Sequence, residues 1–358
     1  MKKLLPWLLC LCLLLCGCEL PAPPPASTAT ISTTAATVSM PAGDTLTVLF
    51  IDVGQADCAL IECGGEYMIV DGGNVEDSDL VVAYLQEEGV EELHTVVCSH
   101  AHEDHVGGLP AVLAVYPTEH ILSPTRTYAS SCFDDFMYYA DQQDLEVTIP
   151  SPGDSFALGG ATVTVLGPVE SYADPNNTSI VLKVEFGTTS FLFTGDMETT
   201  AETDMLDAGM DVSADVLKVG HHGSSTSTGY RFLYEVDPDY AVISVGAGNS
   251  YGHPHVETID ILNDAQIPMF RTDQLGTILA VSDGSEILFT WENQNAEPAN
   301  TEPAGSEQES VTYIGNKNSK KLHLPTCSGL PTESNQVIFS DYDQAIAEGY
   351  TPCSRCLG

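Results

Sequence analysis

The chain has 358 residues, enough for two ordinary domains or for one large domain with appendages. It carries 51 acidic and 11 basic residues, and its formal net charge is −40 at pH 7. Proteins that bind nucleic acid through its phosphates usually present a basic face, so this composition argues against broad electrostatic capture of DNA. A metal site or a basic tail would have to supply the attraction.

The N-terminal segment has the pattern of an export signal. Two lysines precede an apolar run, Leu4 to Leu15, which is too short to span a bilayer comfortably and leads into Cys16-Gly17-Cys18. Residues 1–18 resemble a bacterial lipoprotein signal, which implies lipidation at Cys18 and an extracytoplasmic protein anchored to the cell membrane. An ordinary signal peptide or an N-terminal anchor is the alternative. Residues 19–43, rich in Pro, Ala, Ser and Thr, predict a flexible tether.

The main domain, residues 44–292, begins with strands predicted at Thr45–Asp52, Cys58–Cys63 and Tyr67–Val70. The third strand runs into Asp71-Gly72-Gly73. A carboxylate at the end of a buried strand is costly unless it is paired. Asp71 is therefore expected to have a partner, although a turn-capping aspartate before Gly-Gly is equally consistent with the sequence.

The densest cluster of metal-ligand residue types follows the apolar run Thr95 to Cys98. There the sequence reads Ser99-His100-Ala101-His102-Glu103-Asp104-His105-Val106-Gly107-Gly108. On an extended segment His100 and His102 point the same way and can reach one cation. Asp104 and His105 lie where the chain turns and can face a second cation. The pattern predicts a strand, a ligand loop and a helix around two metal ions; a polar loop with chance histidines is the alternative.

Two later strands also end in metal-ligand residue types. Phe191 to Thr194 runs into Gly195-Asp196, and an aspartate at the lip of a strand can bridge two cations. Val216 to Val219 runs into Gly220-His221-His222-Gly223, and one histidine of this pair is expected to bind metal. Helices are predicted at Leu80–Glu88, Leu109–Val115 and Phe133–Asp144, and further strands at Thr162–Leu166 and Ser179–Phe186.

The motif from His100 to His105 resembles the signature of the metallo-β-lactamase fold superfamily, hydrolases with one or two metals. Membership implies an α/β fold, an αββα sandwich of two mixed sheets with helices outside and the metals at one edge. The run Phe50 to Asp57 is similar to the opening motif of the ComEC-type branch, whose founding members carry this domain on a DNA-uptake channel. Ala56 stands where that branch commonly has Gly, and Leu275 where Asn is usual.

The resemblance implies roles for the residues at the predicted site. Two divalent metals, Zn or Mn, would be bound by His100, His102, Asp104, His105, Asp196 and His222. The catalytic residues would be Asp104, Asp196 and His221, with Asp196 as the bridge and His221 contacting the substrate phosphate or protonating the leaving group. The roles of His221 and His222 could be exchanged. Asp57 and Asp71 would orient the ligands from behind.

Four more residues are candidates for the substrate groove. Asn177 and Ser179 match an Asn-x-Ser motif of the ComEC-type branch, where many superfamily members have another metal-binding histidine. Asn177 then holds substrate or water, or it ends the preceding loop. His253 and His255, in Tyr251-Gly252-His253-Pro254-His255, match a further motif of that branch; a helix-capping or core role is the alternative.

An acidic linker, residues 293–310, separates the main domain from a short tail, residues 311–358. The tail holds His323-x3-Cys327 and Cys353-x2-Cys356, a spacing that predicts one structural zinc. A Cys353–Cys356 disulfide is the alternative. The runs from Tyr313 and from Gly349 resemble the zinc-binding module of Ada-type DNA-repair proteins. His323 replaces the cysteine that accepts a methyl group there, so we expect no methyl transfer.

Together these features predict an exported, lipid-anchored, metal-dependent hydrolase, a phosphodiesterase that acts on DNA during extracellular processing or uptake. Basic residues in the tail would be available for phosphates: Lys317, Lys320, Lys321 and Arg355. Two alternatives stay open. One is a small phosphodiester hydrolase of the phosphocholine type at the cell surface, which the acidic charge favours. The other is an accessory module whose tail holds DNA for the uptake machinery.

Overall fold

The structure, a computed structural model, describes residues 45–300, 313–325, 327, 329–339, 342–353 and 355–357. The predicted signal with Cys18, the tether 19–43 and residues 301–310 of the predicted linker lie outside the described residues. Within the described part of the chain, no helix combines the length and the apolar character needed to cross a bilayer.

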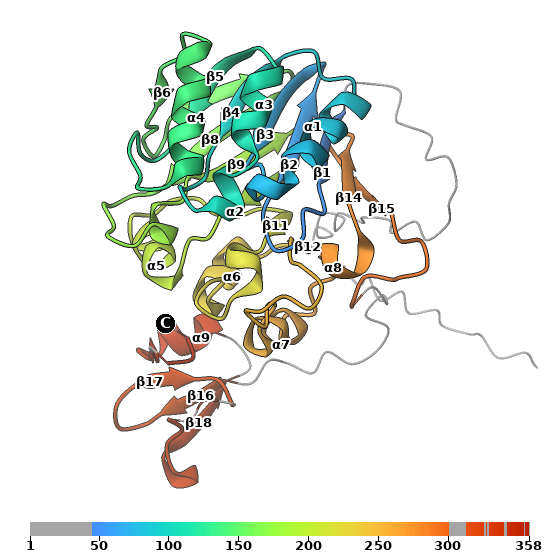
Figure 1. Cartoon of the computed structure of the whole chain (residues 1–358). Helices are drawn as coiled ribbons and strands as arrows, with labels where there is room; N and C mark the ends of the chain where they lie inside the picture. Colours follow the sequence, from blue (N-terminus) through green and yellow to red (C-terminus); the bar gives the residue numbers. More distant parts are fainter. Residues whose placement is uncertain are drawn as a thin grey trace, which may run out of the picture.

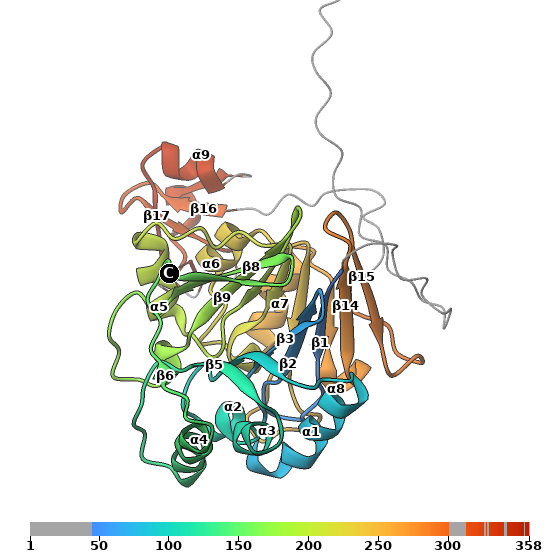
Figure 2. The same ribbon diagram turned by 90° about the horizontal axis from the view of Figure 1, so that it is seen from above.

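Two β-sheets face each other at the centre of the main domain (Figures 1 and 2). The first has eight strands in the order β15-β14-β1-β2-β3-β4-β5-β6. Its strands are β1 (Leu46–Phe50), β2 (Ala59–Cys63), β3 (Glu66–Val70), β4 (Leu93–Val97), β5 (Thr118–Leu122), β6 (Val147–Thr148), β14 (Ile278–Ser282) and β15 (Ile287–Trp291). The second has seven strands in the order β13-β12-β11-β10-β9-β8-β7. Its strands are β7 (Ser155–Leu158), β8 (Ala161–Gly167), β9 (Val181–Phe186), β10 (Thr189–Phe193), β11 (Val216–Lys218), β12 (Tyr240–Ile243) and β13 (Met269–Arg271).

Apolar side chains from both sheets form the central core. β1 alternates buried and partly exposed residues, as expected for a strand with one face in a core. Phe50 stacks on Phe193 of the other sheet with ring centroids 5.9 Å apart, and Phe270 stacks on Phe289 at 4.2 Å. Fully burying such a side chain contributes about 1.5–3 kcal/mol, so these pairs hold the two sheets together.

Helices cover the outer face of each sheet (Figure 1). Those beside the first sheet are α1 (Ser78–Glu87), α2 (Glu103–Val106), α3 (Leu109–Val115) and α4 (Ser131–Gln142). Those beside the second are α5 (Thr199–Asp207), α6 (Tyr230–Val236) and α7 (Val256–Asp264). The short turns are η1 (Val75–Asp77), η2 (Asn176–Thr178), η3 (Gly220–Gly223) and α8 (Thr272–Leu275). This order of layers, helix, sheet, sheet and helix, is the predicted αββα sandwich.

The parallel strands bring the predicted ligands to one edge. β3, β4 and β5 run parallel, as do β10 to β13. The carboxyl ends of parallel strands lie at the same edge of a sheet, which is where α/β proteins place their sites. β4 therefore ends just before the segment that begins at Ser99, β10 just before Asp196, and β11 just before His221.

The tail is a small unit of its own, with sheet order β18-β16-β17-β19. Its elements are β16 (Tyr313–Asn316), β17 (Lys321–His323), η4 (Glu333–Asn335), β18 (Gln336–Phe339), α9 (Tyr342–Ala347) and β19 (Thr351–Pro352). It packs beside α6 and α7 (Figures 1 and 2). The hydroxyl groups of Tyr230 on α6 and Tyr313 on β16 share a hydrogen bond. The tail thus contacts the main domain through its apolar side chains.

The predicted linker also begins in contact with the domain. Ala299 forms a β-bridge with Met269, and Asn300 Nδ2 donates to Asn263 Oδ1 at 2.9 Å. Residues 293–300 therefore lie along the end of the second sheet and not apart from it.

Candidate metal centre

Close backbone approach shapes the loop that carries the first four predicted ligands. His102 is the residue before α2, so Asp104 and His105 fall in the first turn of that helix. Gly108 passes so near β3 that an added Cβ would lie 2.0 Å from the Gly72 carbonyl oxygen. Only glycine fits such an approach, which explains the Gly-Gly pair after the histidines.

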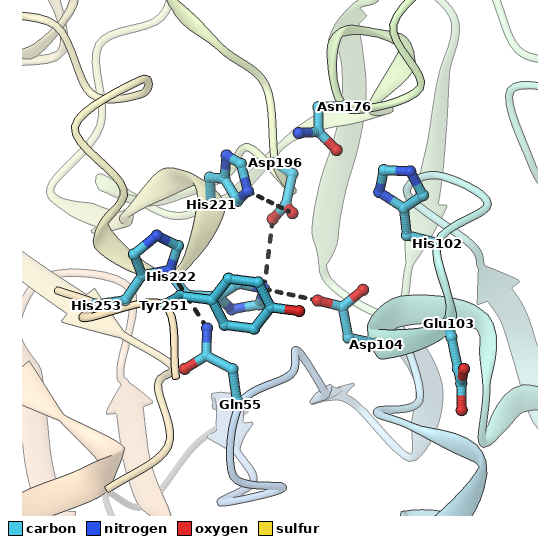
Figure 3. A pocket seen from close by; sticks show the side chains of 10 residues that line it. All are labelled: Gln55, His102, Glu103, Asp104, Asn176, Asp196, His221, His222, Tyr251 and His253. Atoms are coloured by element: carbon cyan, nitrogen blue, oxygen red, sulfur yellow. Dashed lines mark hydrogen bonds and ion pairs between the residues drawn. The ribbon is translucent and has the colours of Figure 1, made fainter. Parts of the chain in front are cut away.

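Asp196 lies at the centre of the predicted ligands (Figure 3). Its Oδ1 is 3.2 Å from His105 Nε2 and 3.7 Å from His222 Nε2. Its Oδ2 is 3.8 Å from His100 Nε2 and 3.6 Å from His221 Nε2. The two oxygens of one carboxylate thus face two different groups of imidazoles, as a bridging ligand must.

A further candidate ligand lies beside each of these two groups of imidazoles. Asp104 Oδ2 lies 3.3 Å from His222 Nε2, on the Oδ1 side of Asp196. His102 Nδ1 lies 3.0 Å from His100 Nε2, on the Oδ2 side. One donor group is therefore Asp104, His105 and His222, and the other is His100 and His102, with Asp196 shared and His221 beside its Oδ2.

Buried atoms without hydrogen-bond partners test whether a cation fits here. Among the described residues, His105 Nε2, Asp196 Oδ1 and His222 Nε2 are buried and make no hydrogen bond. Leaving such an atom unsatisfied costs about 1–3 kcal/mol, more for a charged group. Donor atoms of these residues and of Asp104 all lie within 4.8 Å of one another. Imidazole and carboxylate are the ligand types that Zn and Mn accept, so the residues fit a divalent cation.

Asp71 and Ser99 hold His105 from behind. Asp71 Oδ2 lies 2.8 Å from His105 Nδ1 and accepts the Ser99 hydroxyl at 2.7 Å, while its Oδ1 accepts the Ser99 backbone N–H at 2.7 Å. This contact turns His105 Nε2 toward Asp196, the arrangement that fixes the tautomer of a metal ligand. The geometry matches the orienting role that the resemblance implied for Asp71.

Asp57 gives similar support to His222. Its Oδ1 lies 3.2 Å from His222 Nδ1, which is also 3.1 Å from the Ser244 carbonyl oxygen. Its Oδ2 accepts a hydrogen bond from Lys218 Nζ at 2.9 Å, and both side chains are buried. Asp57 therefore links a buried ammonium group to a candidate ligand.

The electrostatics of the site favour cations. Burial opposes protonation of His222, but the carboxylates of Asp196 and Asp57 outweigh it and raise its pKa to about 10. Burial and the neighbouring His105 lower the pKa of His100 well below its ordinary value. His100 thus presents a neutral imidazole, the form that binds metal, within a site of negative potential.

Unusual backbone angles direct the histidine pair. His221 and His222 both have left-handed conformations, with φ of 50° and 52°. Non-glycine residues rarely adopt this conformation, and it clusters at functional sites. The turn buries His222 and leaves His221 22% exposed toward the cavity. The structure thus buries His222 and places His221 in the wall of the cavity described next.

A cavity of about 340 Å³ opens over these residues. It is lined by Gln55, His102, Glu103, Asp104, Asn176, Asp196, His221, His222, Tyr251 and His253 (Figure 3). Burial and the neighbouring histidines lower the pKa of His253 to about 4, so this imidazole is neutral at pH 7. His253 thus lies in the wall of the cavity, beside the candidate metal ligands.

Three other predicted substrate residues are not among those that line this cavity. Ser179 Oγ accepts the backbone N–H of Asp196 at 3.0 Å and is buried. Asn177 Oδ1 accepts the N–H of Glu198 at 3.1 Å. His255 precedes α7, and its Nδ1 accepts the N–H of Ser225 at 2.9 Å. These contacts tie the three residues to neighbouring loops, and their predicted contact with substrate stays a prediction.

Several residues of the site were missed in the sequence. Gln55, Asn176 and Tyr251 line the cavity, yet nothing in their local pattern distinguishes them from loop residues. Lys218 did leave a signal, because a lysine within the apolar run Val216 to Val219 needs a buried partner. Only the fold shows that this partner is Asp57, 161 residues earlier in the chain.

The tail holds a second, separate cluster of ligands. His323, Cys327, Cys353 and Cys356 offer donor atoms within 4.8 Å of one another. The three cysteines are free, so the structure does not contain the alternative Cys353–Cys356 disulfide. One imidazole and three thiols in a short segment fit a tetrahedral zinc site.

Part of the sequence is similar to known proteins. The chain is 30% identical over 247 residues to ComE operon protein 3 of Bacillus subtilis (strain 168), which covers 64% of this chain and 32% of that protein. It is 33% identical over 221 residues to Recombination protein 2 of Haemophilus influenzae, covering 60% and 26%. It is 30% identical over 230 residues to Competence protein ComA of Neisseria gonorrhoeae, covering 63% and 31%. The chain thus spans about a third or less of the length of these relatives.

A solved structure, the metallo-beta-lactamase fold protein YhfI from Bacillus subtilis, aligns with a TM-score of 0.45 at 13% identity, covering 69% of this chain and all of that one. Residues 305–357 match the family described as the metal binding domain of Ada. Residues 51–247 match the family described as the metallo-beta-lactamase superfamily. This match spans 197 of the 358 residues and contains every predicted ligand of the main domain, so the chain belongs to the metallo-β-lactamase superfamily.

Proposed function

We propose that this chain hydrolyses phosphodiester bonds of DNA outside the cell membrane, to which a lipid on Cys18 anchors it. The observation that carries the reaction class is Asp196, whose two oxygens face two separate donor groups. When bound, a pair of divalent cations lowers the pKa of water to about 7 and neutralises charge on the phosphoryl oxygens.

The residues of the chain would then divide the work of hydrolysis. An oxygen of water bonds to phosphorus, the ester bond breaks, and a proton must reach the leaving oxygen. His221 faces the cavity, with its Nδ1 3.2 Å from Thr226 Oγ1 and 3.6 Å from Glu198 Oε1. These contacts orient the ring so that Nε2 faces the substrate and donates that proton. Asp104, at the other side of Asp196, accepts the proton that water loses.

The relatives support DNA as the substrate. Two of them are named as competence or recombination proteins, and a third is encoded in the ComE operon. The tail adds a second link, since the family it matches is the metal binding domain of Ada. Each relative extends well beyond the matched part, so the proposal concerns the hydrolytic domain and its tail alone.

The test is a direct assay of the full chain in detergent. Single-stranded DNA, duplex DNA, RNA and bis-nitrophenyl phosphate would be offered with added Zn or Mn. We expect cleavage of DNA and of the small diester, and loss of both activities with a chelator. Cleavage of the small diester but of no nucleic acid would exclude DNA as the substrate class.

One observation favours a second candidate, a hydrolase of small phosphodiesters such as phosphocholine esters. Within residues 45–300, every lysine and arginine is paired with a carboxylate. The pairs are Arg126–Glu146, Lys183–Asp211, Lys218–Asp57, Arg231–Asp207 and Arg271–Asp273. The described part of the main domain thus offers DNA no unpaired cation, and a small diester needs none. Glycerophosphocholine in the same assay separates the two candidates.

The location is tested by fractionation. Cys18→Ser removes the proposed lipid attachment site, so we expect the protein to leave the membrane fraction. Unchanged fractionation, with residues 1–18 still present by mass spectrometry, would contradict a lipoprotein.

A further inference from the structure

The metal cavity opens on one side into a larger groove. This groove has a volume of about 730 Å³ and shares Gln55, Glu103, Asp104 and Tyr251 with the metal cavity. We call it the acidic groove, because five carboxylates line it and no lysine or arginine does so among the described residues. The carboxylates belong to Asp52, Glu76, Asp77, Glu103 and Asp104.

The acidic groove would repel a DNA backbone that extended into it beyond the phosphate at the metal cavity. Each further phosphate would lie among carboxylates whose charge no nearby lysine or arginine of the described residues offsets. A nucleoside without further phosphates meets no such penalty. The amino groups of its base can instead donate hydrogen bonds to carboxylates, as cytosine does to Glu and Asp.

The charge differs next to the metal cavity at the turn η2. There the turn η2 separates the metal cavity, lined by Asn176, from a groove of about 520 Å³ lined by Thr178. Glu170 is the one charged residue among the described residues that line this second groove, which is otherwise built from proline, serine, threonine and apolar side chains. We call it the neutral groove. The phosphate backbone of a DNA strand would therefore meet less electrostatic repulsion along the neutral groove than along the acidic groove.

Tyr251 stands at the boundary between the metal cavity and the acidic groove (Figure 3). Its side chain is 68% exposed, and its ring stacks on His253 with centroids 5.6 Å apart. Asn249 fixes the loop, because its Oδ1 accepts the backbone N–H groups of Tyr251 and His253 at 3.1 and 3.0 Å. Gln55 Nε2 lies 3.4 Å from His253 Nδ1 and holds the His253 ring in place. A large aromatic ring is thus held open to solvent beside the site, as in proteins that stack bases.

We propose that Tyr251 stacks against the base of a single terminal nucleoside, so that the enzyme removes nucleotides from one end of a single strand. This inference rests on the proposed function. The strand lies along the neutral groove, the scissile phosphate lies at Asp196, and the last nucleoside lies on Tyr251 above the acidic groove. Water supplies its oxygen to phosphorus and a proton to the leaving ester oxygen. Each turnover releases one terminal unit and leaves a strand shorter by one.

The first experiment compares linear single-stranded DNA, labelled at either end, with circular single-stranded DNA of the same sequence. The full chain is used with Mn or Zn. We expect mononucleotides to appear from one end, and the circle to be cut at least about 100-fold more slowly. Equal rates on circle and linear strand would overturn the inference while leaving the proposed function intact. No cleavage of any DNA would instead remove the proposed function itself.

The second experiment tests Tyr251 directly. Tyr251→Ala should raise KM for linear DNA by about 10-fold, since one stacked base is lost, and Tyr251→Phe should restore it. Tyr138→Ala is the matched control, because Tyr138 is 55% exposed on α4 and does not line the described cavities. An unchanged KM in Tyr251→Ala would overturn the inference. A loss of activity confined to glycerophosphocholine would also overturn it, because it would indicate that the Tyr251 ring contacts a choline group.

Discussion

At the scale of single residues, the candidate centre depends most on Asp196. Each of its oxygens faces a different pair of imidazoles, and one of them is buried without a hydrogen bond. No other described carboxylate lies between both donor groups in this way. The removal of this side chain therefore affects both metal positions at once.

We predict that Asp196→Ala loses both metals of the main domain and lowers kcat by at least about 10³-fold, because the shared ligand is gone. The fold should persist, because Asp196 follows the end of β10 at the edge of the sheets and is not part of the apolar core between them. Elemental analysis after dialysis and circular dichroism measure the two effects. Asp141→Ala, at an exposed position on α4, is the control. Metal content equal to that of the wild type would refute the bridging role.

Lys218 supports the site from further inside. Its ammonium group is buried and bonded to Asp57, which lies 3.2 Å from His222 Nδ1. Breaking a buried ion pair by removing one partner costs about 3–5 kcal/mol, because the remaining charge stays buried. Loss of a group that orients a metal ligand typically lowers metal affinity by about 10–100-fold.

We predict that Lys218→Met lowers the free energy of unfolding by about 3 kcal/mol. The double variant Asp57→Asn with Lys218→Met should recover part of that stability but bind metal more weakly than the wild type, because it removes the carboxylate beside His222. Urea denaturation and metal titration separate the two quantities. A double variant that binds metal as tightly as the wild type would show that the pair acts on stability alone.

At the scale of elements, Tyr84 joins α1 to the β14–β15 hairpin. Its hydroxyl donates to Glu292 Oε1 at 2.6 Å and lies 2.7 Å from Thr277 Oγ1. Asp52, at the start of the acidic groove, donates its backbone N–H to the same Thr277 hydroxyl at 3.1 Å. The tyrosine therefore fixes the helix, the hairpin and the groove wall to one another.

We predict that Tyr84→Phe lowers the free energy of unfolding by about 1–1.5 kcal/mol, the range of one lost hydrogen bond. Burial and the bond to Glu292 raise the pKa of Tyr84 to about 12. A raised pKa means that the protonated form is favoured in the folded state. The contribution is thus complete below pH 10 and is lost as the pH rises toward 12. Urea denaturation at pH 7, 9 and 11 should show a difference between wild type and variant that shrinks only at the highest pH.

At the scale of the whole molecule, the tail and the main domain form one packed body. Tyr230 of α6 belongs to the same apolar cluster as Tyr313 and Tyr342 of the tail. Among the described residues, no carboxylate pairs with a tail lysine: Lys317 and Lys321 donate to carbonyl groups, and Lys320 lies over the ring of Tyr350 at 4.2 Å. The described tail therefore offers lysines that no carboxylate pairs, whereas every lysine and arginine of residues 45–300 is paired with a carboxylate.

We predict that deletion of residues 311–358 weakens DNA binding and lowers its salt slope by about 2–3, since each phosphate contact on a single strand contributes about 0.7. Deletion also exposes Tyr230, so Tyr313→Phe is a second, milder variant. It removes one hydrogen bond of the interface and should lower the Tm by about 2–4 °C. An unchanged salt slope in the deletion variant would show that the tail is not a DNA-binding aid.

The sequence alone indicated the ligand loop, which depends on local pattern, and the fold family, which follows from the resemblance of its motifs to a known superfamily. Strand periodicity and the spacing from His100 to His105 predict a strand, a turn and a helix within a few residues, and the family match confirms that fold. The helix predicted at Leu109–Val115 has the same bounds in the structure as α3. The four tail ligands likewise follow from spacing, since each pair is close in sequence.

Only the tertiary structure decided which distant residues meet. Asp57 and Lys218 pair across 161 residues, and Tyr251 reaches the cavity from a loop that carries no ligand of its own. Asn177 and Ser179 match a motif, yet the fold turns them toward Glu198 and Asp196 and gives Asn176 the place in the wall. The physical reason is that a local pattern fixes which way a strand or helix faces, whereas neighbours across two sheets are set by how the layers pack.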